Sequence, residues 1–318
     1  MVASRLALAV DLGGTNLRGA LVDVDGTILH EQRSATHAEQ GPDAVIARIA
    51  DTLAQVVSAT SAPRDVAVGV AAPGPLNPRT GVVYFCPNLP GWKDTPLRAQ
   101  LESLTGRRVL IGNDANAAAL GEYYFGTRKG VPNLVFVGLG TGVGGGVVSE
   151  GRLIDGALGM GGELGHTTVN IDGPRCHCGG IGCVEAYCSA WALTAEAELL
   201  VGSRRGDAIL AAAGGEPLGP RAVGLAARNG DINSIRLLER AGTALGAGLA
   251  NFVNIFNPDV IVIGGGLAEL GEPLFEPTRR ALRAFALPVM AEHVEVTGSA
   301  LDAKSGIYGA AALVFHAR

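Results

Sequence analysis

The first part of the chain alternates between short apolar runs and glycine-containing turns. Three apolar runs predict β-strands: Arg5–Val10, Leu17–Val24 and Thr27–Glu31. Asp25-Gly26, between the last two runs, is typical of a β-hairpin turn. Pro42 then begins a segment whose apolar residues, from Val45 to Val57, recur at helical spacing. We therefore predict three strands followed by a helix.

Strands and helices continue to alternate as far as Phe125. The next predicted elements are a buried strand at Val66–Val70, a helix at Thr95–Leu104, a strand at Arg108–Ile111 and an Ala-rich helix at Asp114–Phe125. The strand at Val66–Val70 ends in Ala-Ala-Pro-Gly-Pro, a turn that contains Gly74. This alternation is typical of an α/β protein.

A second copy of the opening pattern begins after Asn133. Its predicted strands are Leu134–Leu139, Val143–Ser149 and Arg152–Ile154. Both copies predict the same order of elements: a strand, a glycine turn that contains Thr, a second strand, a turn of an acidic residue and Gly, and a third strand. The two stretches are LAVDLGGTNLRGALVDVDGTIL and VFVGLGTGVGGGVVSEGRLI. This weak internal repeat predicts two related α/β lobes. Gly138 stands in the second copy where the first has Asp11, so we expect the two turns to have different roles.

Helical patterns dominate after Cys183. Asn233–Phe256 is long and apolar on more than one face, which predicts a buried helix. A strand at Val260–Ile263 and an Ala-rich helix at Ser305–His316 follow. No low-complexity linker separates the lobes. We place their boundary near Asn113–Asp114, where the first cycle ends, with a small lobe of 1–113 plus 304–318 and a large lobe of 114–303.

Composition limits the class of protein. Hydrophobic residues make up 47% of the 318 residues and charged residues 17%, which excludes a disordered chain. The net charge of −5 argues against a broad basic surface for nucleic acid. No apolar run approaches the roughly 20 residues that span a bilayer, so we expect no membrane segment. The apolar N-terminal stretch leads directly into Asp11 and a glycine turn, which favours a core strand over a signal peptide.

Three glycine turns follow predicted strands: Asp11-Leu-Gly13-Gly14-Thr15-Asn16, Gly138–Gly146 and Gly264-Gly265-Gly266. Glycines let backbone N–H groups approach phosphate oxygens, and a strand-end Asp can hold a hydrated Mg²⁺. The sequence GxxxxGK[ST] is absent, which excludes a P-loop, and no GxGxxG opens a helix, which argues against a dinucleotide fold. The alternative is that each of these segments is an ordinary tight turn that binds no phosphate.

Asp114 lies at a strand end and begins a predicted helix, within Asn113-Asp114-Ala115-Asn116. One interpretation is a helix cap, because Asp and Asn satisfy the free N–H groups of a first helical turn. The other is a general base, since phosphoryl transfer uses one carboxylate to orient the attacking oxygen. The uncharged Asn and Ala neighbours suit the second role.

The five cysteines form a poor disulfide framework and a better metal site, which favours the cytoplasm. His166, Cys176, Cys178 and Cys183 give the pattern H-x9-C-x-C-x4-C, whose four soft ligands match a tetrahedral Zn²⁺ site. His177 is a rival ligand, but we expect its side chain to point away because it stands between two coordinating cysteines. We interpret Cys86 and Cys188 as buried thiols.

Together these motifs resemble the ROK family (repressor, open reading frame, kinase) of sugar kinases, over essentially the whole chain. The most specific parts are Asp11-Leu-Gly-Gly-Thr15, Gly161-Gly-Glu-Leu-Gly-His166 and the Cys-His-Cys-Gly-Gly-Ile-Gly-Cys-Val-Glu stretch that ends at Glu185. Asn88-Leu-Pro-Gly-Trp92 and the stretch Asn113–Glu122 look most like bacterial glucokinases. The resemblance implies a two-lobed α/β actin/hexokinase-like ATPase fold with a ribonuclease H-like duplicated core.

The resemblance also implies a role for each motif. Asp114 would be the general base on the sugar 6-hydroxyl. The residues implied to bind the sugar ring are Gly74, Asn88, Asn113, Asp114, Glu163, His166 and Glu185. His166 would also ligate a structural Zn²⁺ with the three cysteines, so that the metal fixes the orientation of a sugar-binding imidazole. Gly13, Gly14, Thr15 and Asn16, with Gly140, Thr141 and Gly142, would embrace the ATP phosphates. Asp11 would position Mg²⁺, and Gly264, Gly265 and Gly266 would border adenosine.

The implied function is cytoplasmic, ATP-dependent 6-phosphorylation of glucose, a step of glycolysis, in a cleft between the two lobes of a homodimer or higher homo-oligomer. Other hexoses remain open as substrates: mannose, fructose, N-acetylglucosamine or N-acetylmannosamine. A non-catalytic sugar-sensing regulator and a polyphosphate donor are weaker alternatives. Many family members are repressors with a DNA-binding module before the first glycine turn; only ten residues precede Asp11 here, and we expect no such module.

Overall fold

The structure is a computed structural model that describes residues 5–86, 89–301 and 304–317. It contains two compact units. Unit 1 comprises residues 1–132, 146–162 and 299–318, and unit 2 comprises residues 133–145 and 163–298. This division differs from the predicted boundary, because α3 (Asp114–Phe125) packs against α11 (Ser305–His316) and so belongs to unit 1. The sequence pattern shows where one series of alternating strands and helices ends, but it does not show which unit the following helix packs in.

Unit 1 is built on a five-stranded sheet in the order β3-β2-β1-β4-β8. Its strands are β1 (Leu6–Leu12), β2 (Asn16–Asp23), β3 (Ile28–Ala35), β4 (Val68–Ala72) and β8 (Val109–Asn113). The first three strands are antiparallel neighbours, whereas β4 runs parallel to both β1 and β8. The parallel strand ends therefore bring the turn after β1 and the start of α3 to one edge of the sheet.

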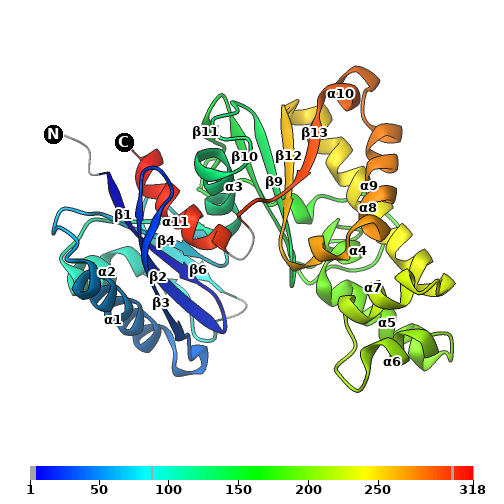
Figure 1. The fold of residues 1–318 in the computed structure, drawn as a ribbon, viewed down its shortest axis with the longest axis horizontal. Helices are drawn as coiled ribbons and strands as arrows, with labels where there is room; N and C mark the ends of the chain where they lie inside the picture. Colours follow the sequence, from blue (N-terminus) through cyan, green and yellow to red (C-terminus); the bar gives the residue numbers. More distant parts are fainter. Residues whose placement is uncertain (1–4, 87–88, 302–303, 318) are drawn as a thin grey trace. The chain divides into compact units, whose positions relative to one another are not determined.

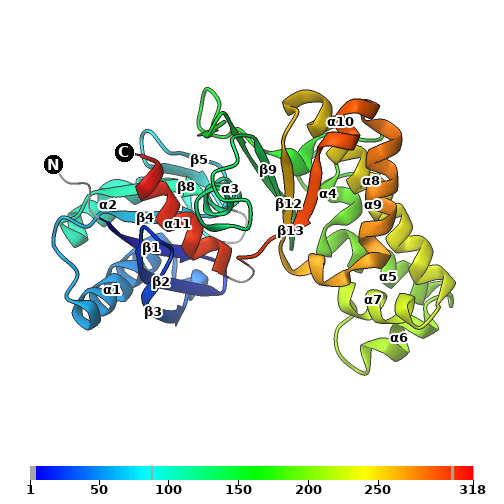
Figure 2. The same cartoon turned by 45° about the horizontal axis from the view of Figure 1, so that its top comes forward.

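Helices cover both faces of this sheet (Figure 1). α1 (Pro42–Thr60) and α2 (Leu97–Thr105) share a buried cluster with Leu8 and Val10, while α11 packs with Ala7 and Ala9. The side chains of β1 thus alternate between the two faces, as expected for a strand buried on both sides. The small residues of β1 let α11 lie close against β1 and β4 (Figure 2).

A small three-stranded sheet in unit 1 is absent from the sequence prediction. It consists of β5 (Leu76–Asn77), β6 (Val82–Phe85) and β7 (Lys93–Thr95), in that order, with antiparallel pairing. The strands have only two to four residues, too few to give an alternating apolar pattern.

The second large sheet has the order β11-β10-β9-β12-β13. Its strands are β9 (Leu134–Leu139), β10 (Val143–Ser149), β11 (Arg152–Leu153), β12 (Val260–Gly264) and β13 (Glu295–Gly298). β12 runs parallel to β9 and β13, and β11 is antiparallel to β10. The strand order repeats that of the first sheet, as the internal sequence repeat predicts. The chain passes from unit 2 to unit 1 within β10.

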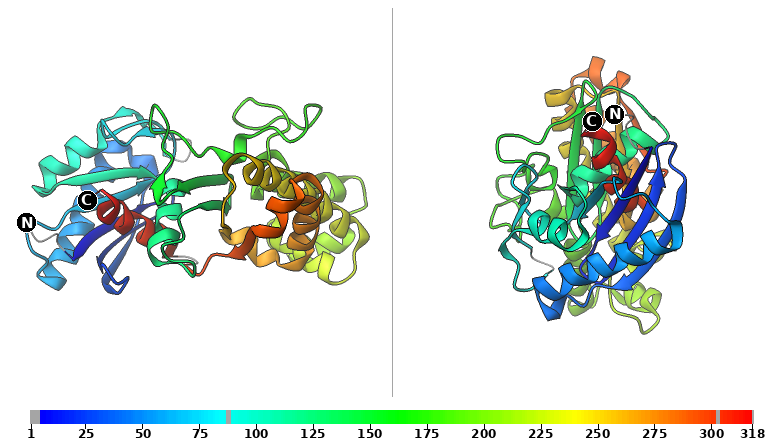
Figure 3. Two further views of the ribbon diagram at one scale, coloured as in Figure 1. Left: turned by 90° about the horizontal axis from the view of Figure 1, so that it is seen from above. Right: turned by 90° about the vertical axis from the view of Figure 1, so that its left-hand side faces the viewer.

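Most of unit 2 is helical. Its helices are α4 (Glu185–Cys188), α5 (Ala190–Gly202), α6 (Asp207–Ala213), α7 (Pro220–Arg228), α8 (Ile232–Phe256), α9 (Glu272–Phe285) and α10 (Pro288–His293). α8 and α9 lie side by side (Figure 3). Gly246 of α8 permits this, because an added Cβ would overlap the Thr278 carbonyl of α9. Within the described residues, no helix is long and apolar enough to cross a membrane.

Candidate functional site

The first glycine turn joins β1 to β2 and is closed by its own backbone. The N–H of Gly13 donates to the carbonyl of Asn16 at 2.9 Å, and the buried Thr36 hydroxyl donates to the Gly13 carbonyl at 2.7 Å. Thr15 and Asn16 are exposed at the tip. The turn is therefore held rigidly while its tip stays accessible, which suits the predicted contact with phosphate.

Asp11 lies at the end of β1, before this turn, in a crowded position. Its carboxylate forms an ion pair with Arg18 at 3.0 Å, and its side chain is 19% exposed. Burial raises the pKa of Asp11 above its ordinary value of 3.8, and Arg18 offsets part of that rise. Gly306, near the start of α11, lies so close that an added Cβ would overlap the carboxyl. The position thus fits a carboxylate held in one orientation, as a bound Mg²⁺ requires.

The catalytic candidate Asp114 is the first residue of α3 and is exposed; its Oδ1 accepts a hydrogen bond from the N–H of Ala115 at 2.8 Å. Asn113 is the helix cap, since its Oδ1 accepts from the N–H groups of Ala115 and Asn116. Its amide donates to the Gly74 carbonyl at 3.4 Å. The structure therefore brings Gly74, Asn113 and Asp114 together and assigns the capping role to Asn113. Asn88 lies outside the described residues.

The second glycine turn, between β9 and β10, is also closed by its own backbone, through a tighter bond that spans three residues instead of four. The N–H of Gly140 donates to the Gly142 carbonyl at 2.9 Å, and Thr141 is exposed. The third turn lies beside it. Gly264 pairs with Gly138 in the sheet, and Gly265, with φ of 85°, approaches the carbonyl of Leu139 too closely to carry a Cβ.

Glu185 connects the second glycine turn to the cysteine loop, the segment from Cys176 to Cys183 that carries three of the predicted metal ligands. It is buried, its Oε2 accepts from the N–H of Val143 at 2.8 Å, and its Oε1 accepts from the Cys176 thiol at 3.5 Å. Gly142 allows this approach, because an added Cβ would overlap the Glu185 carboxylate. A residue expected only to bind sugar therefore also contacts the second glycine turn.

The predicted metal ligands form one cluster in unit 2. Ligand atoms of His166, Cys176, Cys178 and Cys183 all lie within 4.8 Å of one another. The Cys178 and Cys183 sulfurs are 3.8 Å apart, and Cys176 Sγ lies 3.7 Å from His166 Nδ1. A tetrahedral zinc with Zn–S bonds of about 2.3 Å places two sulfurs about 3.8 Å apart. The donor set and its spacing therefore fit zinc.

Electrostatics also favour a cation in this cluster. Burial raises the pKa of the Cys176 thiol to about 12, and the nearby carboxylate of Glu185 adds to the rise. Thiolates crowded in this way need a positive charge to stay ionised, and a bound metal ion supplies it.

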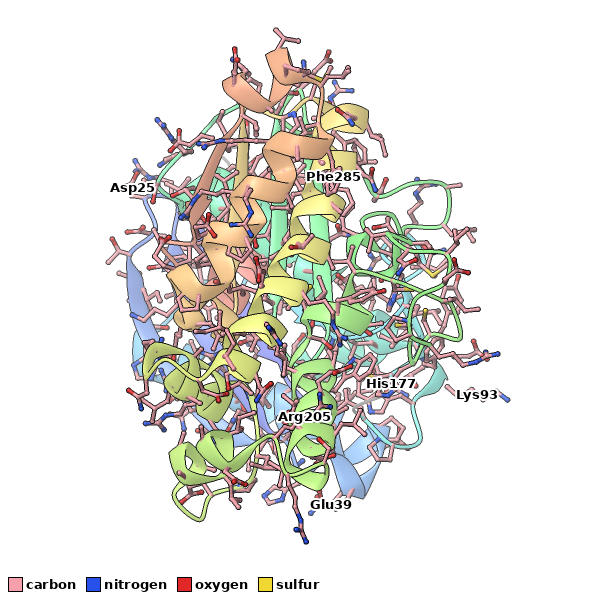
Figure 4. The ribbon with its side chains drawn as sticks, turned by 90° about the vertical axis from the view of Figure 1, so that its right-hand side faces the viewer. Asp25, Glu39, Lys93, His177, Arg205 and Phe285 are labelled. Carbon is pink, nitrogen blue, oxygen red and sulfur yellow. The ribbon has the colours of Figure 1, made fainter. Side chains whose placement is uncertain are left out.

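His166 presents its two ring nitrogens to different neighbours. Nδ1 faces Cys176, whereas Nε2 lies 4.0 Å from the Oε2 of the exposed Glu163. The rival ligand His177, labelled in Figure 4, stacks on Trp191 with ring centroids 4.0 Å apart and is not part of the cluster. This agrees with the expectation that His177 points away. Cys86 and Cys188 are buried thiols, as predicted.

Comparison with known proteins assigns the chain to a family. A sequence profile of the ROK family matches residues 7–317. The chain belongs to the ROK family. It is 40% identical to the glucokinase of Thermotoga maritima over 310 residues, which cover 96% of each chain.

Solved structures agree with this assignment. The ROK hexokinase of Thermus thermophilus gives a TM-score of 0.82 at 34% identity and covers 98% of both chains. A ROK family glucokinase from Streptomyces griseus, solved in complex with glucose and AMPPNP, gives 0.79 at 33% identity, over 97% of this chain and 98% of the other. These similarities confirm the predicted family and the actin/hexokinase-like fold class.

Several contacts around the site were not predicted from the sequence. Arg18 pairs with Asp11, Gly306 packs against the same carboxyl, Asn116 bonds the Gly161 carbonyl, and Trp191 holds His177. The contacts of Gly306, Asn116 and Trp191 join separate segments of the chain, whereas Arg18 faces Asp11 because β1 and β2 pair in the sheet. Arg18 and Asn116 lie in stretches already singled out, but no spacing rule distinguishes them from their neighbours.

Proposed function

We propose that this chain is a glucokinase, which transfers the γ-phosphoryl group of ATP to the 6-hydroxyl of glucose. The observation that carries the proposal is the 40% identity to a glucokinase over 96% of the chain. A solved relative with 33% identity binds glucose and AMPPNP, which supports the same pair of substrates.

In the proposed reaction Asp114 is the general base. It accepts the proton of the sugar 6-hydroxyl as that oxygen attacks the γ-phosphorus, and the bond from the γ-phosphorus to the β,γ-bridging oxygen breaks to release ADP. The exposed position of Asp114 at the start of α3 leaves it accessible to a sugar.

The glycine turns and Asp11 would bind the nucleotide. Gly13–Asn16 and Gly140–Gly142 would donate N–H groups to phosphate oxygens, and Gly264–Gly266 would border adenosine. Asp11 would hold Mg²⁺, which offsets the charge of the phosphates. The ion pair of Asp11 with Arg18 and its contact with Gly306 support a fixed orientation for that carboxylate.

Sugar recognition would depend on Glu163, His166 and Glu185, with Asn88, Asn113 and Gly74. Zinc bound through His166 Nδ1 would leave Nε2 for a sugar hydroxyl. As a metal-bound thiolate, Cys176 would not donate to Glu185 Oε1, and that oxygen would be available to accept from the sugar. Zinc would therefore have a structural role that prepares two sugar contacts.

A panel of sugars with ATP and Mg²⁺, assayed by ADP release, tests the proposal. Glucose should give the highest kcat/KM, and Asp114→Asn should lower kcat by at least ~10²-fold while glucose still binds, because loss of a general base typically costs that much. The matched control is Asp51→Asn, an exposed carboxylate of α1, which should leave kcat unchanged. Near-normal turnover by Asp114→Asn would end the assignment.

The same panel separates the alternatives. Higher kcat/KM with mannose, fructose or an N-acetylhexosamine would change the substrate, polyphosphate in place of ATP would change the donor, and no ADP with any sugar would favour a sugar-sensing regulator. We further propose a cytoplasmic homodimer. Five cysteines outside any disulfide support a reducing compartment, and light scattering measures the oligomeric state.

A further inference from the structure

Asn116 of α3 has an unusual environment. The residue is 4% exposed, and its amide Nδ2 donates to the backbone carbonyl of Gly161 at 2.8 Å. Its Oδ1 is buried and has no hydrogen-bond partner among the described residues. The two residues on either side along the helix are Ala115 and Ala117, so a polar side chain is not required by the helix itself.

Stability does not explain this asparagine. A buried acceptor without a partner costs more stability than one neutral hydrogen bond returns, and alanine is the better helix former. Gly161 is only partly buried, so water can satisfy its carbonyl when no side chain does. A side chain that lowers stability at this position needs another reason to be there.

The position of Gly161 supplies that reason. Gly161 ends a loop that is closed by its own N–H bond to the Asp155 carbonyl at 2.9 Å and held by Arg79, which donates to the carbonyls of Gly156 and Ala157. Glu163 is two residues further along the chain.

Asn116 itself lies two residues after Asp114 in the same helix. The hydrogen bond from its carboxamide therefore joins α3, the helix that carries the proposed general base, to the backbone segment just before Glu163 and His166. The helix also packs closely against β10, because a Cβ added at Gly146 would overlap the Cβ of Ala119 and crowd Asn116 Cα.

We propose that Asn116 is a positioning residue for sugar recognition. Its hydrogen bond to the Gly161 carbonyl fixes the end of the unit 1 segment 146–162. The proposed sugar-binding stretch begins directly after that segment, at Glu163. The inference rests on the proposed glucokinase function, because it assigns Asn116 a part in binding that enzyme's sugar. Asn116 does not itself contact the substrate.

The test is steady-state kinetics of Asn116→Ala and Asn116→Ser with both substrates varied. Alanine cannot donate, and the serine hydroxyl is too short to replace the amide at Gly161. Both variants should lower kcat/KM for glucose by roughly tenfold to a hundredfold, mainly through KM, because a small misplacement of binding groups costs that much. KM for ATP should stay within about twofold, since uniform loss of sugar binding leaves nucleotide contacts intact.

Two further measurements separate positioning from a merely structural role. The thermal midpoint of Asn116→Ala should equal or exceed that of the unmodified protein, and amide hydrogen exchange in residues 155–162 should become faster. Asn229→Ala, at the exposed end of α7, is the control and should change none of these quantities.

Each outcome decides the matter. An unchanged glucose KM in both variants overturns the proposal, and so does an equal rise in both KM values with a lower thermal midpoint. Failure of the glucokinase assignment is recognised separately, because the unmodified protein would then release no ADP with glucose.

Discussion

The carboxylate of Glu185 accepts a hydrogen bond from the backbone N–H of Val143 at 2.8 Å, so the residue that follows the cysteine loop holds the second glycine turn. Gly142 makes this approach possible, because any side chain there would overlap the carboxylate. In unit 2, the groups proposed to bind sugar, zinc and phosphate are therefore in direct contact. A change at Glu185 should affect all three, whereas a change at Glu163 should affect sugar alone.

Replacement of Glu185 tests this connection. Glu185→Ala leaves the buried N–H of Val143 without a partner, which should lower the free energy of unfolding by about 1–3 kcal/mol. The loosened turn should raise KM for ATP as well as for glucose. Glu185→Gln retains an acceptor and should keep most of the stability. Urea unfolding and two-substrate kinetics measure these effects.

The matched control for Glu185 is Glu163→Ala. Glu163 is exposed, so this variant should raise KM for glucose without changing KM for ATP or the urea midpoint. The same ATP affinity in both variants would show that Glu185 does not support the glycine turn.

Gly306→Ala tests the orientation of Asp11. The added methyl group would overlap the carboxyl and force it to turn. Changes that reorient a metal-binding carboxylate typically cost about 10- to 100-fold in metal affinity, so the concentration of Mg²⁺ needed for half-maximal rate should rise by that amount. Alanine is the better helix former, so α11 itself should not lose stability. Gly202→Ala, where an added Cβ meets open space, is the control, and an unchanged Mg²⁺ requirement would contradict the assignment of Asp11.

Asp11 should also make the folded state less stable as the pH rises. Burial raises its pKa in the folded protein above 3.8, so the folded state keeps this proton at pH values where the unfolded state has released it. Stability from this group is therefore fully present below pH 3.8, is lost as the pH rises to the folded pKa, and stays lost above it. Asp11→Asn cannot ionise and avoids the loss.

Urea unfolding between acidic and neutral pH measures this effect. The stability of Asp11→Asn relative to the unmodified protein should increase with pH across the window that begins at 3.8, even though the variant should be a poor kinase. If the stability of Asp11→Asn relative to the unmodified protein decreased as the pH rises, the raised pKa of Asp11 would be contradicted.

The repeated elements could be predicted from the sequence because strong local patterns define them. The structure has the predicted bounds for α3, β9, β10 and α11, where apolar runs meet glycine or capping residues. β5, β6 and β7 were missed because strands of two to four residues carry no usable period. β13 was missed because its residues are only partly buried and mixed in character.

The residues of the site were also predictable only in part. The ligands of the metal cluster were predictable, since three cysteines lie close together in the chain and His166 precedes them. The contacts of Asp11 with Gly306 and of Asn116 with Gly161 were not, because each depends on packing between segments far apart in sequence. Spacing rules identify candidate chemistry, whereas orientation depends on the folded neighbours.

Removal of one zinc ligand tests the cluster and its link to sugar binding. Cys178 is the exposed thiol of the four ligands, and Cys178→Ser removes a sulfur while changing little of the core. Bound zinc measured by elemental analysis should fall well below one ion per chain. His166 would then lose the metal proposed to fix its ring, so KM for glucose should rise by about 10- to 100-fold, as for other changes that disturb the ligands around a metal. Cys86→Ser, at a buried thiol outside the cluster, should retain its zinc. Full zinc occupancy in Cys178→Ser would remove Cys178 from the ligand set, and normal glucose KM in a zinc-free variant would separate the metal from sugar recognition.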